Sequence, residues 1–209
     1  MDIKINYNPL VSIGYLSVDV PQDVMCEINQ EVFELKNTSF SNAIPFNNRL
    51  YGAIEKEFKL VNCFNILEKF TTVVSKQYWQ FTNKPELFHK KHSIEDVWVN
   101  FQNKYEFNPL HIHTKCDLSF VIWVRIPYNI KNEIALPSVA YSNDFQKQAT
   151  SFVFVYPDGS NLNTRHIQVD ESYQGKMIVF PSSLQHQVYP FFTSDDYRIS
   201  VAGNIILED

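Results

Sequence analysis

The sequence predicts a mainly β (α+β) fold, a jelly-roll barrel with N-terminal helices packed on one of its sheets. Three observations predict it. The chain has 209 residues, a length that favours a single domain. Apolar residues recur at helical spacing only in the first part of the chain. From Asp96 onward the pattern has period two, in short segments separated by turn residues, which is typical of antiparallel strands. We therefore expect one domain, with a helical N-terminal flank over residues 1–93 and a β core over residues 94–209.

Two helices are expected in the N-terminal flank. Pro21 suits the first turn of a helix that ends near Lys36, because Val24, Ile28, Val32 and Leu35 follow at helical spacing. A longer helix is expected from about Val61 to Phe81, where apolar and aromatic residues form one stripe and Asn83 and Pro85 lie just beyond it. We interpret this stripe as a face packed on a sheet.

At least six antiparallel strands are expected in the β core. They cover residues 97–102, 118–126, 151–156, 164–169, 176–180 and 197–206. The third and fourth form a hairpin around the turn Pro157-Asp158-Gly159-Ser160. Strands joined in this way, with helices supplied only from the N-terminal side, favour a jelly roll whose helices cover one sheet.

Composition excludes several classes of protein. The 18 basic and 23 acidic residues give a net charge of -5, which argues against a nucleic-acid or anionic-membrane partner. The five glycines form neither GxGxxG nor a P-loop, which argues against a nucleotide-binding loop. No apolar run approaches the roughly 18 residues of a membrane helix, and no signal peptide follows Met1. Three cysteines at no metal-finger or redox spacing fit a reducing compartment. We expect a soluble cytoplasmic protein, and the sequence also allows a homodimer.

Three histidines are candidate metal ligands. His111 and His113 lie two residues apart before a strand, and on an extended backbone their rings point the same way, so both could bind one ion. His186 lies where the chain re-enters a strand. Three neutral imidazoles suit Fe(II), Zn or Mn. Taken singly, the pair could be exposed loop residues and His186 a core histidine, whereas His89 and His92 lie in a basic stretch that we expect at the surface.

The last strand has one plainly apolar face and one polar face. Its polar face carries Arg198, Ser200, Ala202 and Asn204. On a half-exposed strand Arg198 would face water, but in a closed barrel it would point inward and need an acidic side chain or a dicarboxylate as partner. On the strand at 97–102, the inward residues Asn100 and Gln102 could contact a ligand or simply fill the barrel, as could Trp123.

These motifs in combination resemble the Fe(II)- and 2-oxoglutarate-dependent oxygenase superfamily. The motifs are His111-Ile112-His113, Phe180-Pro181-Ser182-Ser183 with His186, and Arg198-Ile199-Ser200 with Asn204. More narrowly, the chain is similar to oxygenases encoded by tailed phages of marine cyanobacteria and by some bacteria. The resemblance covers roughly Asp96 to Ile206.

The resemblance implies a double-stranded β-helix, a cupin-like jelly roll, that uses Fe(II) and 2-oxoglutarate. It implies His111 as the proximal ligand and His186 as the distal ligand. Arg198 would anchor the C5 carboxylate of 2-oxoglutarate, with a hydroxyl hydrogen bond from Ser200. Because of its inward position on the strand at 97–102, we also expect Asn100 to contact the cosubstrate. The implied reaction hydroxylates a substrate and releases succinate and CO2.

The third ligand position departs from the usual pattern, because most of the superfamily carries HxD or HxE there. Our preferred interpretation is that His113 ligates in place of the carboxylate. Asp117 could instead reach the metal if the loop folds back. In a third alternative, His113 is not a ligand and its position is left to water or substrate.

Two other classes of function remain open. One is a non-catalytic jelly-roll binding or virion-associated protein with a relic metal site. The other is a three-histidine iron enzyme similar to thiol dioxygenases, which would ignore 2-oxoglutarate. The substrate, a small molecule or a peptide, has no signature in the sequence, because the loops that would select it, such as residues 129–150, carry no transferable motif.

Overall fold

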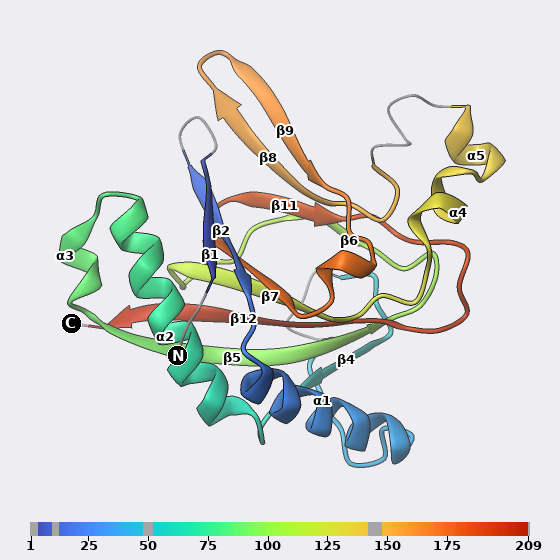
Figure 1. Ribbon diagram of the computed structural model, residues 1–209, viewed down its shortest axis with the longest axis horizontal. Helices are drawn as coiled ribbons and strands as arrows, with labels where there is room; N and C mark the ends of the chain where they lie inside the picture. The colour runs from blue at the N-terminus through green and yellow to red at the C-terminus, as the bar shows by residue number, and fades with distance from the viewer. Residues whose placement is uncertain (1–3, 10–12, 48–51, 142–147, 209) are drawn as a thin grey trace.

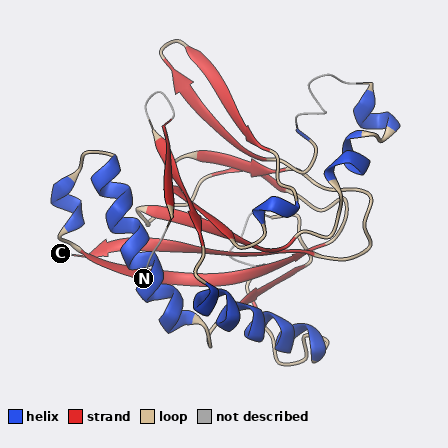
Figure 2. Cartoon of the chain, viewed as in Figure 1, coloured by secondary structure: helices blue, strands red, loops and turns tan. Residues whose placement is uncertain are grey.

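Two antiparallel sheets form the body of the protein (Figures 1 and 2). The computed structural model describes residues 4–9, 13–47, 52–141 and 148–208. The larger sheet has eight strands in the order β1-β2-β10-β7-β12-β5-β4-β3, and the smaller has four in the order β6-β11-β8-β9. The strands are β1 Ile5–Pro9, β2 Gly14–Asp19, β3 Ile44–Pro45, β4 Lys56–Lys59, β5 Lys91–Gln102, β6 Asn108–His111, β7 Leu118–Arg125, β8 Phe152–Asp158, β9 Asn161–Ile167, β10 Lys176–Pro181, β11 Gln185–Val188 and β12 Arg198–Glu208. The predicted strands of the β core are thereby confirmed.

Two long helices cover the outer face of the larger sheet, as predicted (Figure 1). They are α1, Gln22–Asn37, and α2, Phe64–Phe81. Their apolar stripes pack with the outward residues of β5 and β12 into one core that excludes water. That core includes Val24, Ile28, Leu67, Phe70, Val74, Val97, Val99, Phe101, Ile199 and Val201. Shorter helices are α3 Pro85–Phe88, α4 Ile130–Ile134, α5 Pro137–Ala140 and the 3-10 turn η2 Glu171–Tyr173.

Helix α2 begins three residues later than predicted, and a buried carboxylate explains where. Glu31 of α1 accepts hydrogen bonds from the backbone N–H groups of Val61, Asn62 and Cys63 at 2.7, 3.0 and 2.9 Å. These groups directly precede the helix, where backbone donors lack intrahelical partners and a negative charge is favoured. Glu31 therefore joins α1 to the start of α2.

The N-terminal flank also contributes strands that the sequence analysis did not predict. β2 pairs with β10, and β4 pairs with β5, so both extend the larger sheet. β5 itself begins at Lys91, just before the expected boundary at residues 93 and 94. The division of the chain at that boundary stays a prediction, but the flank is not purely helical.

The prediction that His92 lies at the surface is wrong. His92 is the second residue of β5, and its ring is buried against α2, where Nδ1 lies 2.7 Å from Ser75 Oγ and Nε2 lies 3.0 Å from the Leu87 carbonyl oxygen. Burial lowers the pKa of His92. The basic residues around it suggested a solvated loop, whereas the strand turns this one ring inward.

A second apolar core fills the space between the two sheets. It joins Trp123, Ile178 and Phe180 of the larger sheet to Phe152 and Phe154 of the smaller one. Beside this core, facing residues of both sheets line a pocket. This arrangement of facing antiparallel sheets is that of the predicted jelly roll.

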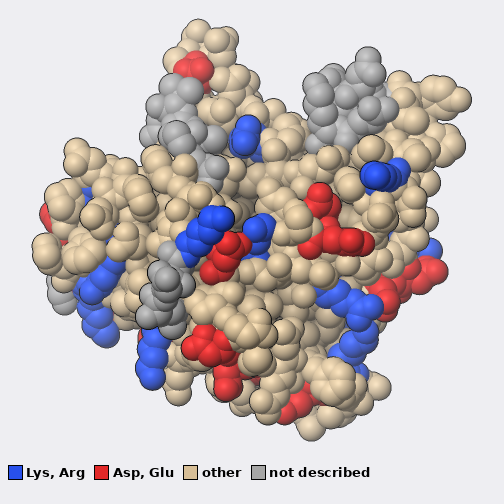
Figure 3. Space-filling view, in the orientation of Figure 1, with Lys and Arg blue, Asp and Glu red and all other residues tan. Residues whose placement is uncertain are grey.

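Charged residues of both signs are interspersed on the face of the molecule shown in Figure 3. That face carries no continuous basic surface of the kind that binds nucleic acid. Among the described residues, none of the helices combines the length and the apolar character that crossing a membrane would require.

Candidate metal centre

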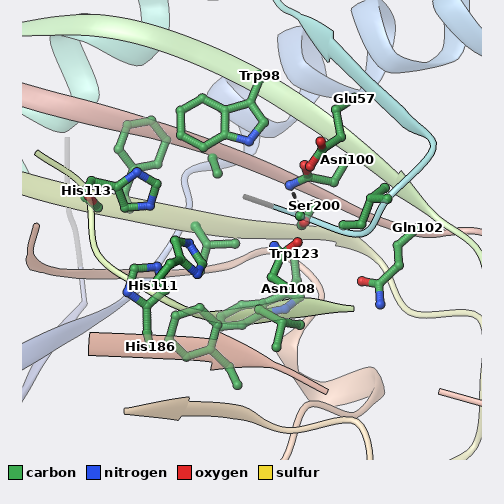
Figure 4. Close-up of a pocket in the computed structure, with 18 of the residues that line it drawn as sticks. Glu57, Trp98, Asn100, Gln102, Asn108, His111, His113, Trp123, His186 and Ser200 are labelled. Atoms are coloured by element: carbon green, nitrogen blue, oxygen red, sulfur yellow. Dashed lines mark hydrogen bonds between the residues drawn. The ribbon is translucent and has the colours of Figure 1, made fainter. Parts of the chain in front are cut away.

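Three histidines converge in the pocket between the sheets (Figure 4). β6 and β11 pair antiparallel so that His111 and His186 are direct partners across the ladder. His113 follows β6, and its backbone N–H donates to the Ser182 carbonyl oxygen at 2.9 Å. One ring nitrogen from each histidine lies within 4.8 Å of those of the other two. The predicted convergence of these three side chains is confirmed.

Backbone carbonyl groups fix the orientation of two of the rings. His111 Nδ1 lies 2.7 Å from the Pro109 carbonyl oxygen, and His186 Nδ1 lies 2.9 Å from that of Leu184. A carbonyl oxygen only accepts, so Nδ1 carries the proton in each ring and Nε2 keeps its lone pair. A hydrogen bond from Nδ1–H to a carbonyl oxygen is the usual support of an imidazole that binds metal through Nε2.

Burial keeps the cluster uncharged. It lowers the pKa of His111, lowers that of His113 to about 4 with a contribution from nearby His111, and holds the pKa of His186 well below its usual value. Neutral imidazole is the form that binds metal, because the imidazolium has no free lone pair. Three neutral nitrogen donors at this spacing fit Fe(II).

Aromatic rings enclose the cluster. The ring of Phe152 stacks on that of His186 with centroids 5.5 Å apart, and the Phe180 ring lies 4.8 Å away on edge. The ring centroids of Trp98 and His113 lie 5.9 Å apart. These apolar walls restrict water and limit the movement of the rings.

Asp117 lies outside this cluster. Its carboxylate accepts the backbone N–H of Leu207 at 2.8 Å, and its own backbone N–H and C=O pair with Ile205 and Ser182. The side chain is thus held beside the end of β12. In this arrangement it contributes no ligand atom to the group of three histidines.

Arg198 lies inside the pocket, as expected for a closed barrel, and is only 2% exposed. Its five N–H groups are all used. Gln102 Oε1 accepts from Nε and Nη2 at 3.0 and 2.7 Å, and the Tyr128 hydroxyl and the carbonyl oxygens of Thr150 and Tyr189 accept the rest. These partners are neutral, so within the described residues no acidic group compensates this buried charge. A buried cation of this kind favours an anionic ligand.

The other predicted pocket residues lie where the alternation of the strands places them. Ser200, Ala202, Asn100, Gln102 and Trp123 all line the pocket. Asn100 Nδ2 donates to Ser200 Oγ at 3.2 Å across the β5–β12 ladder, drawn as a dashed line in Figure 4. The pocket has a cavity volume of about 70 Å³ and is partly open to solvent.

Two polar residues of the pocket were missed in the sequence. Glu57 of β4 is 1% exposed, and burial, together with the charge of Glu106, raises the pKa of its carboxyl to about 7. Asn108 begins β6 and has a buried Oδ1 without a partner among the described residues. Nothing in the short segment around Glu57 predicts a strand, because β4 has only four residues, two of them lysine.

Comparisons with known proteins agree with this geometry. A family model described as "Putative 2OG-Fe(II) oxygenase" matches residues 96–204, just over half of the chain. Among curated proteins no significant relative is found.

Three solved structures are similar to the fold. They are a prolyl-4-hydroxylase from Pseudomonas putida (TM-score 0.57, 12% identity, 96% of each chain covered), a viral collagen prolyl hydroxylase from Paramecium Bursaria Chlorella virus-1 in complex with 2OG (0.50, 13%, 91% and 94%), and the epimerase SnoN from nogalamycin biosynthesis (0.52, 11%, 93% and 77%). At these identities the likeness concerns the fold, and it confirms the predicted fold class.

Proposed function

The chain belongs to the 2OG-Fe(II) oxygenase family, and we propose that it hydroxylates its substrate at an iron held by His111, His113 and His186. The family uses Fe(II) and 2-oxoglutarate, and the predicted resemblance to it is confirmed. When bound, Fe(II) and 2-oxoglutarate would use O2 to oxidise a C–H bond to an alcohol, with one oxygen atom going to the substrate and the other to succinate, which forms from 2-oxoglutarate with release of CO2. The observation that carries the proposal is a cluster of three neutral imidazoles in the same pocket as a buried, uncompensated guanidinium.

We assign the third ligand to His113 rather than to Asp117. His113 shares the cluster with the two other rings, whereas the Asp117 carboxylate is engaged with the backbone N–H of Leu207. A ligand set of three imidazoles is uncharged, so it adds one negative charge less to the metal than a set with a carboxylate.

Arg198 anchors the distal carboxylate of 2-oxoglutarate in this proposal. Because all five of its N–H groups are already used, the carboxylate has to displace an acceptor. Gln102 Oε1 accepts from Nε and Nη2 together, on the edge of the guanidinium that a carboxylate would take in a bidentate pair. We expect the Gln102 side chain to move aside when 2-oxoglutarate binds, with Ser200 Oγ nearby to donate a further hydrogen bond.

Anaerobic addition of Fe(II) and 2-oxoglutarate tests the proposal. The wild type should develop a visible charge-transfer band, and Arg198→Gln should require at least tenfold more 2-oxoglutarate to reach it because the charged pair is lost. His186→Ala should lose the iron, since two imidazoles remain. His89→Ala, a histidine outside the pocket, is the matched control.

The alternatives give different spectra. Bound iron without a band would favour the thiol-dioxygenase-like enzyme. An absence of iron binding would favour a relic site in a binding protein. Either result would contradict the proposed function.

The reaction outcome and the substrate go beyond the family assignment. The similar solved structures carry the names of two prolyl hydroxylases and an epimerase, so the fold alone is compatible with more than one outcome. Hydroxylation of a small molecule or a peptide is our proposal. A phage origin, a cytoplasmic location and a homodimer stay predictions.

A further inference from the structure

We propose that the pocket binds an ammonium group of the substrate through three oxygen acceptors, Glu57, Asn100 and Asn108. The inference rests on the proposed function and names a substrate class for it, a primary amine. In Figure 4 the histidines lie at the left of the pocket, and Glu57 and Asn100 lie at its upper right. The amine would bind there while a carbon chain extends towards the histidines.

Glu57 is the charged member of this group, which we call the amine subsite. It lies directly opposite Asn100 in the β4–β5 ladder. Among the described residues its carboxyl receives a single long hydrogen bond, 3.4 Å from Asn47 Nδ2 to Oε2, and pairs with neither lysine nor arginine. A carboxyl group that is 1% exposed and so poorly compensated is unfavourable without a ligand.

Two amide oxygens lie beside it and, within the described part of the chain, also lack donors. Asn100 is 5% exposed and uses Nδ2 for Ser200, so its buried Oδ1 is left unpartnered among the described residues. Asn108 Oδ1 is likewise buried and has no hydrogen-bond donor among the described residues. A β-carbon built on Gly52 would clash with Asn108 Oδ1 and lie 3.0 Å from Glu57 Oε1, so both oxygens border the same small space. Buried acceptors without donors are costly, and here several face one pocket.

The chemistry of the amine subsite disfavours 2-oxoglutarate as its occupant. The carboxylates and keto group of 2-oxoglutarate offer acceptors only, and they would be repelled by an ionised carboxyl and unpaired amide oxygens. An ammonium group offers three donors and one positive charge, which match three acceptors, one of them a carboxylate. A cation beside Glu57 would also favour its ionised form, opposing the effect of burial.

Calorimetric titration under anaerobic conditions tests the inference. The probes are n-butylamine, putrescine and L-lysine, each paired with its N-acetylated form, added to the protein with Fe(II) and 2-oxoglutarate. At least one amine should bind at least tenfold more tightly than its acetylated form, because acetylation removes the charge and two donors. Glu57→Gln should abolish this preference, and Asn108→Ala should weaken amine binding several-fold.

The matched control is Glu55→Gln, which removes the same charge from an exposed residue outside the pocket and should keep the preference. Thermal melting of each variant checks its folding, and the absorbance band of Fe(II) and 2-oxoglutarate is recorded in the same samples. If the absorbance band forms but no amine binds, or the amines bind equally well to the wild type and Glu57→Gln, the amine subsite is overturned and the proposed function stands. If amine binding depends on Glu57 but the band does not form, the proposed function is overturned and the amine subsite stands.

Discussion

Replacing Glu57 by glutamine should stabilise the ligand-free protein at alkaline pH and leave its stability nearly unchanged in acid. The carboxyl group is buried on β4, and its pKa is raised from 4.5 to about 7, first by burial and then by the charge of Glu106. Below pH 4.5 the group is protonated in both the folded and the unfolded chain. Between pH 4.5 and 7 the unfolded chain loses the proton first, so the folded state loses stability as the pH rises.

The size of the effect follows from the shift of the Glu57 pKa. At about 1.4 kcal/mol per pH unit, the difference between 4.5 and about 7 corresponds to about 3 kcal/mol of lost stability above pH 7. Glutamine keeps the shape of the side chain and carries no charge, so the variant escapes this loss. For a domain of this size, the melting temperature should then rise by roughly 6–12 °C.

The assay is thermal and urea unfolding of the wild type and Glu57→Gln at pH 5 and pH 8.5, without metal. Comparing the two proteins at each pH cancels the other titrating groups. Glu55→Gln, an exposed carboxylate, should show no such dependence on pH. A difference between Glu57→Gln and wild type that is the same at both pH values, or a variant less stable at pH 8.5, would refute the reasoning.

Two further predictions concern the scaffold. Glu31→Gln should destabilise the protein by about 1–3 kcal/mol in urea unfolding, because one of the two oxygens that accept the N–H groups before α2 becomes an N–H2 donor. The control is Glu34→Gln, at an exposed position of the same helix. Equal losses of stability in the two variants would contradict the role of Glu31. Gly203→Ala should cost about 1–3 kcal/mol, because its β-carbon would lie 2.5 Å from Phe120 Cζ and 2.8 Å from the Asp96 carbonyl oxygen. An unchanged melting temperature would show that this part of the sheet can shift.

Local periodicity explains why many elements could be predicted. The stripe of α2 and the alternation in β12 are each visible within one segment, because a helix buries every third or fourth residue and a strand every second. The resemblance led us to expect His111 and His186 close together, and their direct pairing in the ladder of β6 and β11 is a finding of the structure.

The unpredicted elements are those whose stability comes from distant partners. β4 has four residues and pairs along its whole length with β5, about forty residues later in the chain, and at one end with the short β3. Its sequence carries no pattern long enough to distinguish a strand from a loop. His92 was misjudged for the same reason, because its contacts with Ser75 and Leu87 come from α2 and the segment after it.

By itself, the sequence determined the fold class, the two long helices, most strands and the family, because these follow from short-range periodicity and from motifs. Only the tertiary structure decided that Arg198 is buried among neutral acceptors and that Glu57 lies in the same pocket. The physical reason is that burial and charge compensation depend on which strands pair, and pairing brings together residues that are far apart in the chain.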